Sequence, residues 1–155
     1  MEFVFEKLRT GKYDRLLVIQ GGRMEEIACP KIGGIPHDMV HFAVENTLSK
    51  KGFLRRVEEG ETLTFRMKTD IESDQMERLV EVMQADAISG FPPAREMIEM
   101  YRVTCDARGV APWPISEQDI AAVRAEMARL AVLWMHTEPG QTLTLRFENE
   151  VETSE

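Results

Sequence analysis

Apolar and polar residues alternate near the start of the chain, and this pattern predicts β-strands. Phe3 and Phe5 alternate with polar or smaller neighbours, and residues 15–19 form a β-prone run closed by a glycine pair. Residues 24–29 could return across that glycine turn as a third strand. We therefore expect an antiparallel meander at the N-terminus, followed by a loop over residues 29–34.

Two later segments, residues 60–67 and 140–147, also alternate apolar and polar residues after a glycine. Period-two alternation is typical of a half-buried strand, so each segment is expected to add a strand to the sheet. Their similarity reflects either an internal duplication or the chance recurrence of β-prone composition.

Helical spacing of apolar residues predicts four helices. Proline suits the first turn of a helix, so the first helix is expected from about Pro36 to Lys50. Ser73 can cap a second helix, and a third follows the break at residues 91–93. The fourth begins near Ser116, and its narrow apolar stripe could pack on the sheet or on a partner helix.

The strands are separated from one another by a block of helices, and this order favours an α+β fold over a parallel α/β sheet. We expect an antiparallel sheet of about four or five strands, covered on one face by about four helices. Residues 1–147 are expected to form a single domain, and the acidic residues 148–155 a frayed tail.

Charge and cysteine usage narrow the classes of partner. Nineteen basic and 27 acidic side chains leave a net charge of −8, which opposes binding to nucleic acid and to anionic membranes. Cys29 and Cys105 form no C-x-x-C pair and fit a reducing compartment. With no cationic leader and no long apolar run, the sequence predicts a cytoplasmic protein without a membrane partner.

One stretch, residues 35–45, concentrates the candidate chemistry. On a helix, residues four apart share a face, so His37, His41 and Glu45 form one stripe. The run His37-Asp38-Met39-Val40-His41 resembles the His-Glu-x-x-His signature of zinc hydrolases, with aspartate replacing glutamate. In that signature the histidines bind the metal and the carboxylate activates water.

The resemblance covers five residues and does not extend to the longer metzincin signature. Val44 and Thr47 stand where that signature has glycine and a third histidine. We therefore assign the chain to no zinc-hydrolase family.

A metal at this stripe, with zinc as one expected ion, needs at least one more protein ligand. Glu45 and His136 are the main candidates, and Glu58, Glu59 and Glu61 are also available. Asp38 would then serve as a general base or would orient a ligand.

A purely structural role for each of these residues is the alternative. Asp38 would complement the helix dipole, and His37 would be a surface residue of the first turn. His41 would hydrogen-bond to Glu45, and His136 would lie at a helix C-terminus.

Two functions follow from these observations. The first is a small binding or interaction module that self-associates as a homo-oligomer, which rests on the ten adaptable methionines and on the missing catalytic motifs. The alternative is a metal-dependent enzyme of the hydrolase type. The sequence contains no Gly-x-Ser-x-Gly elbow and no phosphate-cradling glycine loop, so nucleophilic and nucleotide chemistry have little support.

Overall fold

The computed structural model describes residues 2–32, 34–48, 54 and 71–147 of the chain. The strands are β1 (Glu2–Glu6), β2 (Tyr13–Gln20), β3 (Arg23–Ile32), β4 (Ile35–Pro36) and β5 (Thr142–Leu145). The helices are α1 (His37–Leu48), α3 (Ile71–Ile88), α4 (Ala94–Ala107) and α5 (Glu117–Met135).

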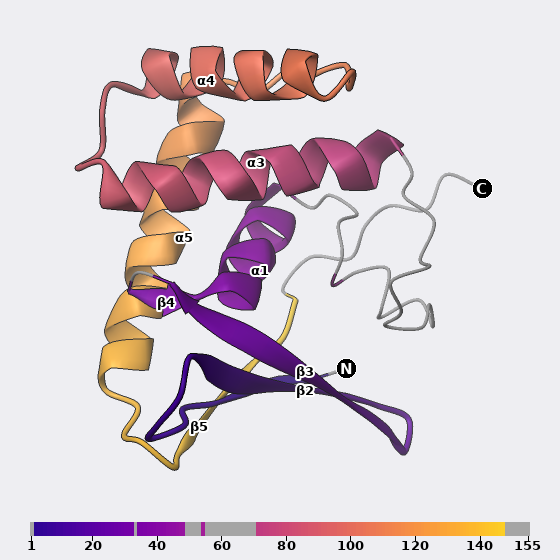
Figure 1. The fold of residues 1–155 in the computed structure, drawn as a ribbon, viewed down its shortest axis with the longest axis vertical. Coiled ribbons are helices and arrows are strands. Elements are labelled where there is room, and N and C mark those ends of the chain that lie inside the picture. The colour runs from indigo at the N-terminus through magenta and orange to yellow at the C-terminus, as the bar shows by residue number, and fades with distance from the viewer. Residues whose placement is uncertain (1, 33, 49–53, 55–70, 148–155) are drawn as a thin grey trace.

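The strands form one curled antiparallel sheet in the order β4-β3-β2-β1-β5 (Figure 1). Alternate residues of the central strands are buried, among them Phe3 and Phe5 on β1 and Leu16 and Val18 on β2. Because neighbouring side chains of a strand point to opposite faces, this alternation gives the sheet one core face. The N-terminal meander predicted from the sequence is confirmed.

The predicted loop over residues 29–34 is wrong, because β3 continues to Ile32 and pairs there with β4. Proline and paired glycines are typical of loops, and Pro30 begins this stretch within β3. The Lys31 N–H donates to the Lys12 carbonyl at 2.9 Å, so the N–H-less nitrogen of Pro30 faces the other side of the strand. The strand on that side is β4, which pairs with β3 only at Lys31 and Ile32. The missing N–H of Pro30 therefore costs the sheet no hydrogen bond.

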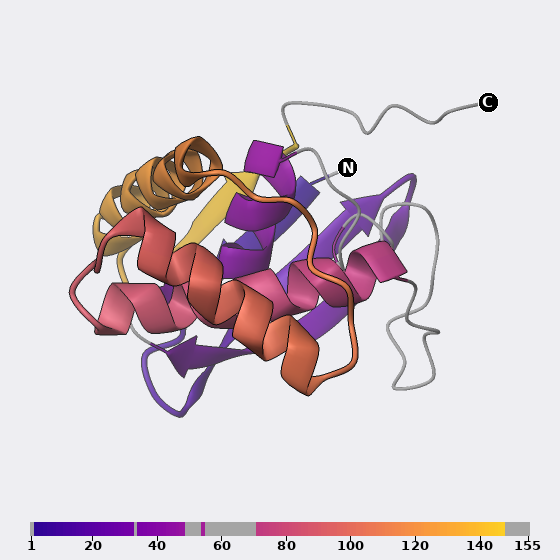
Figure 2. The same cartoon turned by 90° about the horizontal axis from the view of Figure 1, so that it is seen from above.

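The four helices in the described residues lie on one side of the sheet, and α1 is enclosed between the sheet and α3 (Figures 1 and 2). Most of α1 is buried, and its Phe42 ring packs edge-on against Phe3 of the sheet. A helix buried on all sides normally lacks polar residues. On α1, however, Asp38, His41 and Glu45 are buried with the apolar residues, which draws attention to this helix as the site of chemistry.

The structure confirms the α+β class, the antiparallel sheet and the four helices. The strand expected within residues 140–147 is β5, whereas residues 60–67 and 148–155 lie outside the described residues. Ser116 caps α5 in a reciprocal capping box with Asp119, as the sequence predicted. Within the described part of the chain, no helix combines the length and apolar character required to cross a bilayer.

Candidate metal centre

Two histidines of α1 and one glutamate of α3 bring their ligand atoms together. The Nε2 atoms of His37 and His41 lie 3.2 Å apart, and Oε2 of Glu77 lies 3.4 Å from Nε2 of His41. One ligand atom from each residue lies within 4.8 Å of the other two. In the described part of the chain this is the one group of three such residues that could hold a metal ion.

The two separations at His41 match those around a single small ion. Two ligands at about 2.05 Å from a tetrahedral zinc lie about 3.3 Å from each other. The 3.2 Å and 3.4 Å separations at His41 are close to this edge length. Two histidines with one carboxylate are also a known ligand set of catalytic zinc sites and of non-haem iron sites, which leave a position for water.

The outer nitrogen of His37 fixes the orientation of its ring. Nδ1 of His37 lies 2.9 Å from Oε1 of Gln84 on α3, which accepts its hydrogen bond. With the proton on Nδ1, Nε2 of His37 carries a lone pair toward His41 and Glu77. Metal-binding histidines are usually held in this way by an oxygen acceptor on the ring's far side.

His41 has a carboxylate on each side of its ring. Glu77 faces Nε2, while Oε2 of the fully buried Glu45 lies 3.9 Å from Nδ1. Glu45 also accepts a hydrogen bond from the Leu54 N–H at 3.2 Å, which holds the carboxylate in place. Glu45 therefore lies near the outer nitrogen of His41, and Glu77 lies near the inner nitrogen, where it could be a third metal ligand.

Burial keeps His41 neutral. Desolvation lowers the pKa of His41 to about 4, against the opposing attraction of Asp38 and with a smaller contribution from His37. A metal ligand must offer an unprotonated nitrogen, and a histidine with this pKa does so throughout the neutral range. Burial raises the pKa of Glu77, an effect that the charges of His37 and Arg78 partly oppose.

Asp38 and His136, the other residues singled out in the sequence, lie outside this group of three. Asp38 is buried beside Cys29 of β3, and burial together with this carboxylate raises the pKa of the Cys29 thiol. His136 is exposed at the C-cap of α5, where its Nδ1 lies 2.8 Å from the Val132 carbonyl. Glu58, Glu59 and Glu61 lie outside the described residues.

Sequence reasoning missed Glu77 and Gln84, although a signal for them exists. They are seven residues apart on α3 and flank the fully buried Val80, so they share one helical face with an apolar core position. Polar residues on such a face suggest a buried polar contact. Only the packing of α3 against α1 shows that the contact is with the two histidines.

No family model, curated protein or solved structure matches this chain.

Proposed function

We propose that the chain binds one divalent transition-metal ion, with zinc favoured, through His37, His41 and Glu77, and that it acts as a hydrolase-type enzyme. The observation that carries this proposal is the 3.2 Å approach of the two Nε2 atoms. Because His37 Nδ1–H donates a hydrogen bond to Gln84 Oε1, a lone pair of His37 Nε2 points at His41. Such a contact is stable only with a proton or a cation between the two rings.

The ligand set supports a catalytic site over a closed structural one. Three protein ligands leave a fourth position for water, and zinc in such a site lowers the pKa of its water to about 7. Glu77 retains 34% of its side-chain exposure, so this side of the site is open to solvent. Asp38 is proposed to favour positive charge at His41, which suits an orienting role better than that of a general base.

Titration of chelator-treated, untagged protein with Zn²⁺ by calorimetry tests the proposal. We expect one ion per chain, with binding lost in the His37→Ala/His41→Ala double variant and strongly weakened in Glu77→Gln. His136→Ala is the matched control and should bind zinc as the unaltered chain does. Failure to bind zinc, iron(II) or manganese(II), or equal weakening by His136→Ala, would reject the site.

The hydrolase step needs a separate measurement. The zinc-loaded chain should hydrolyse 4-nitrophenyl acetate faster than the zinc-free chain, and Glu77→Gln should remove the difference. The chain could bind one zinc ion and still show no metal-dependent hydrolysis of this ester or of a peptide library. That result would support the metal site and reject the proposed hydrolase activity.

A second candidate function, a self-associating interaction module, is favoured by exposed apolar residues near the end of α5. Val132 and Met135 are 52% and 71% exposed, which is unusual for large apolar side chains on a helix that otherwise packs on the core. Light scattering during size exclusion at several concentrations tests this function. A dimer that dissociates in the Val132→Ser/Met135→Ser variant would support self-association. A strict monomer at all concentrations would reject it.

A further inference from the structure

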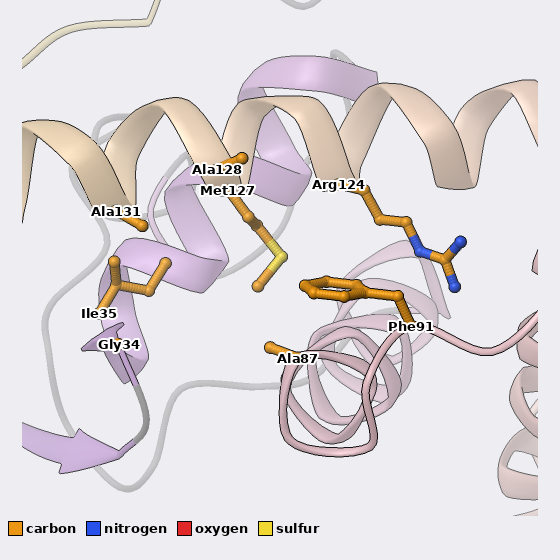
Figure 3. A pocket seen from close by; sticks show the side chains of 8 residues that line it. All are labelled: Gly34, Ile35, Ala87, Phe91, Arg124, Met127, Ala128 and Ala131. Carbon is orange, nitrogen blue, oxygen red and sulfur yellow. The ribbon is translucent and has the colours of Figure 1, made fainter.

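A hollow of about 110 Å³ lies between the C-terminal end of α3, the middle of α5 and strand β4 (Figure 3). Its walls are almost entirely apolar, and its main lining residues are Ile35, Ala87, Phe91, Met127, Ala128 and Ala131. Three of these six residues are alanines on facing helices. The hollow therefore exists because small side chains stand where larger ones would close the gap between α3 and α5.

A smaller hollow of about 60 Å³ shares the walls formed by Ile35, Ala87 and Met127 and extends to Gln84. Gln84 is the residue that accepts the hydrogen bond of His37. The smaller hollow is therefore lined by a residue that contacts His37 of the candidate metal centre.

Phe91 adopts an unfavourable backbone conformation at the rim. Its φ of 59° lies in the left-handed region, which bulky residues avoid, and the following residue is Pro92, which disfavours helical conformations in the residue before it. Phe91 is nevertheless 59% exposed, so core burial does not account for a large apolar residue at this position. Strained residues of this kind tend to occur at binding sites, where the surrounding structure holds them in place.

Arg124 holds this strained turn. Its guanidinium donates two hydrogen bonds of 2.8 Å to the buried Asp86 and one of 2.6 Å to the Pro92 carbonyl. It also lies 5.8 Å from the centre of the Phe91 ring. These contacts hold the backbone next to Phe91 and place a cation beside its ring, which limits the ordering cost of binding.

We propose that the hollow is a binding site for a small molecule carrying one aromatic ring or a branched aliphatic group of similar size. An apolar cavity of about 150 Å³ is known to bind benzene, so this volume suits a single ring or a slightly smaller group. The Met127 thioether projects between Ile35 and Phe91, where it can contact the edge of such a ring (Figure 3). Phe91 supplies an aromatic face at the mouth of the hollow.

Nuclear magnetic resonance of chelator-treated full-length protein, labelled with ¹³C at the methionine methyl groups, tests the site with toluene as the probe. Toluene should shift the Met127 signal saturably, while the signal of Met135, which is 71% exposed on the same helix, should stay in place. Because metal is absent, the result does not depend on the proposed metal centre.

Two substitutions at exposed positions of α5 provide a matched pair. Ala128→Leu fills the hollow and should weaken toluene binding at least tenfold, whereas Ala122→Leu adds the same side chain away from the hollow and should leave binding unchanged. An unsaturable Met127 shift, or equal affinity in Ala128→Leu and Ala122→Leu, would overturn the proposal.

A third variant, Phe91→Asn, tests the role of the strained residue. Asparagine tolerates the left-handed region better than phenylalanine, so the melting temperature should stay equal or rise. Toluene affinity should fall at the same time. A lower melting temperature with unchanged toluene affinity would show that Phe91 stabilises the fold and takes no part in the site.

Discussion

His37 and His41 point their Nε2 atoms at each other across one turn of α1, at a separation of 3.2 Å. Helical geometry alone explains why the two rings are neighbours, because residues four apart lie on the same face. It does not explain why both rings also have an oxygen acceptor near Nδ1, which is Gln84 for His37 and Glu45 for His41. The hydrogen bond from Nδ1 orients the His37 ring, and the Glu45 carboxylate lies 3.9 Å from Nδ1 of His41, an arrangement that a shared cation would favour.

Glu45→Gln should weaken zinc binding by about 10–100-fold without preventing folding. The carboxylate lies 3.9 Å from Nδ1 of His41, and its negative charge is expected to make the ring a stronger ligand for the proposed metal. Glutamine keeps the size of this fully buried side chain while removing its charge. Calorimetric titration with zinc measures the effect.

Two comparisons make this prediction specific. Glu77→Gln removes a direct ligand and should weaken binding more than Glu45→Gln does, while the exposed Glu99→Gln on α4 should have no effect. Stronger weakening by Glu45→Gln than by Glu77→Gln would mean that Glu45, as first expected from the sequence, is the ligand.

Folding stability of the metal-free protein should decrease when the pH is lowered below the ordinary pKa of histidine. Burial lowers the pKa of His41 from 6.5 to about 4, so between these values the unfolded chain binds a proton that the folded chain does not. The shifted pKa of His41 has almost no effect on the free energy of unfolding above about pH 7. At about pH 5 it lowers that free energy by about 2 kcal/mol. Urea unfolding at about pH 7.5 and pH 5 measures it.

Four titratable groups lie near His41. They are His37, Asp38 and Glu45 on its own helix and Glu77 on α3. The raised pKa of Glu77 acts in the opposite direction, because the folded chain then keeps a proton that the unfolded chain releases. Comparing the Glu77→Gln variant with the His41→Gln/Glu77→Gln double variant isolates the contribution of His41 to the pH dependence of stability. Equal pH dependence with and without His41 would contradict the prediction.

The fold could be read from the sequence wherever one local rule was sufficient. Period-two alternation around Phe3 and Phe5 gave β1, and the Ser116 and Asp119 pair gave the start of α5. The exception near Pro30 arose because the strand-breaking effect of proline depends on which side of the strand its nitrogen faces. That orientation is set by the pairing partner and has no local signal.

The candidate site could be read from the sequence only in part, for the same reason. The helical stripe brought together His37, His41 and Glu45 because all three lie on one helix. Glu77 and Gln84 come from α3, and their contact with α1 depends on how two helices separated by residues 49–70 pack together. A residue pattern specifies the face of each helix, but tertiary packing decides which faces meet.

Replacing Arg124 with alanine should destabilise the protein by about 3 kcal/mol, because it leaves the Asp86 carboxylate buried without its cation. Asp86 is 1% exposed and receives both hydrogen bonds of a forked pair from Arg124, while Arg124 retains 21% of its side-chain exposure. Chemical unfolding of the metal-free chain measures the loss.

The double variant Asp86→Ala/Arg124→Ala separates this pairing from simple loss of packing. Removing both partners eliminates the uncompensated charge, so the double variant should be more stable than the sum of the two single effects predicts. Additive effects would mean that Arg124 and Asp86 stabilise the fold independently of each other. The ion pair would then also not be what holds the strained turn at Phe91, because Arg124 could reach the Pro92 carbonyl without Asp86.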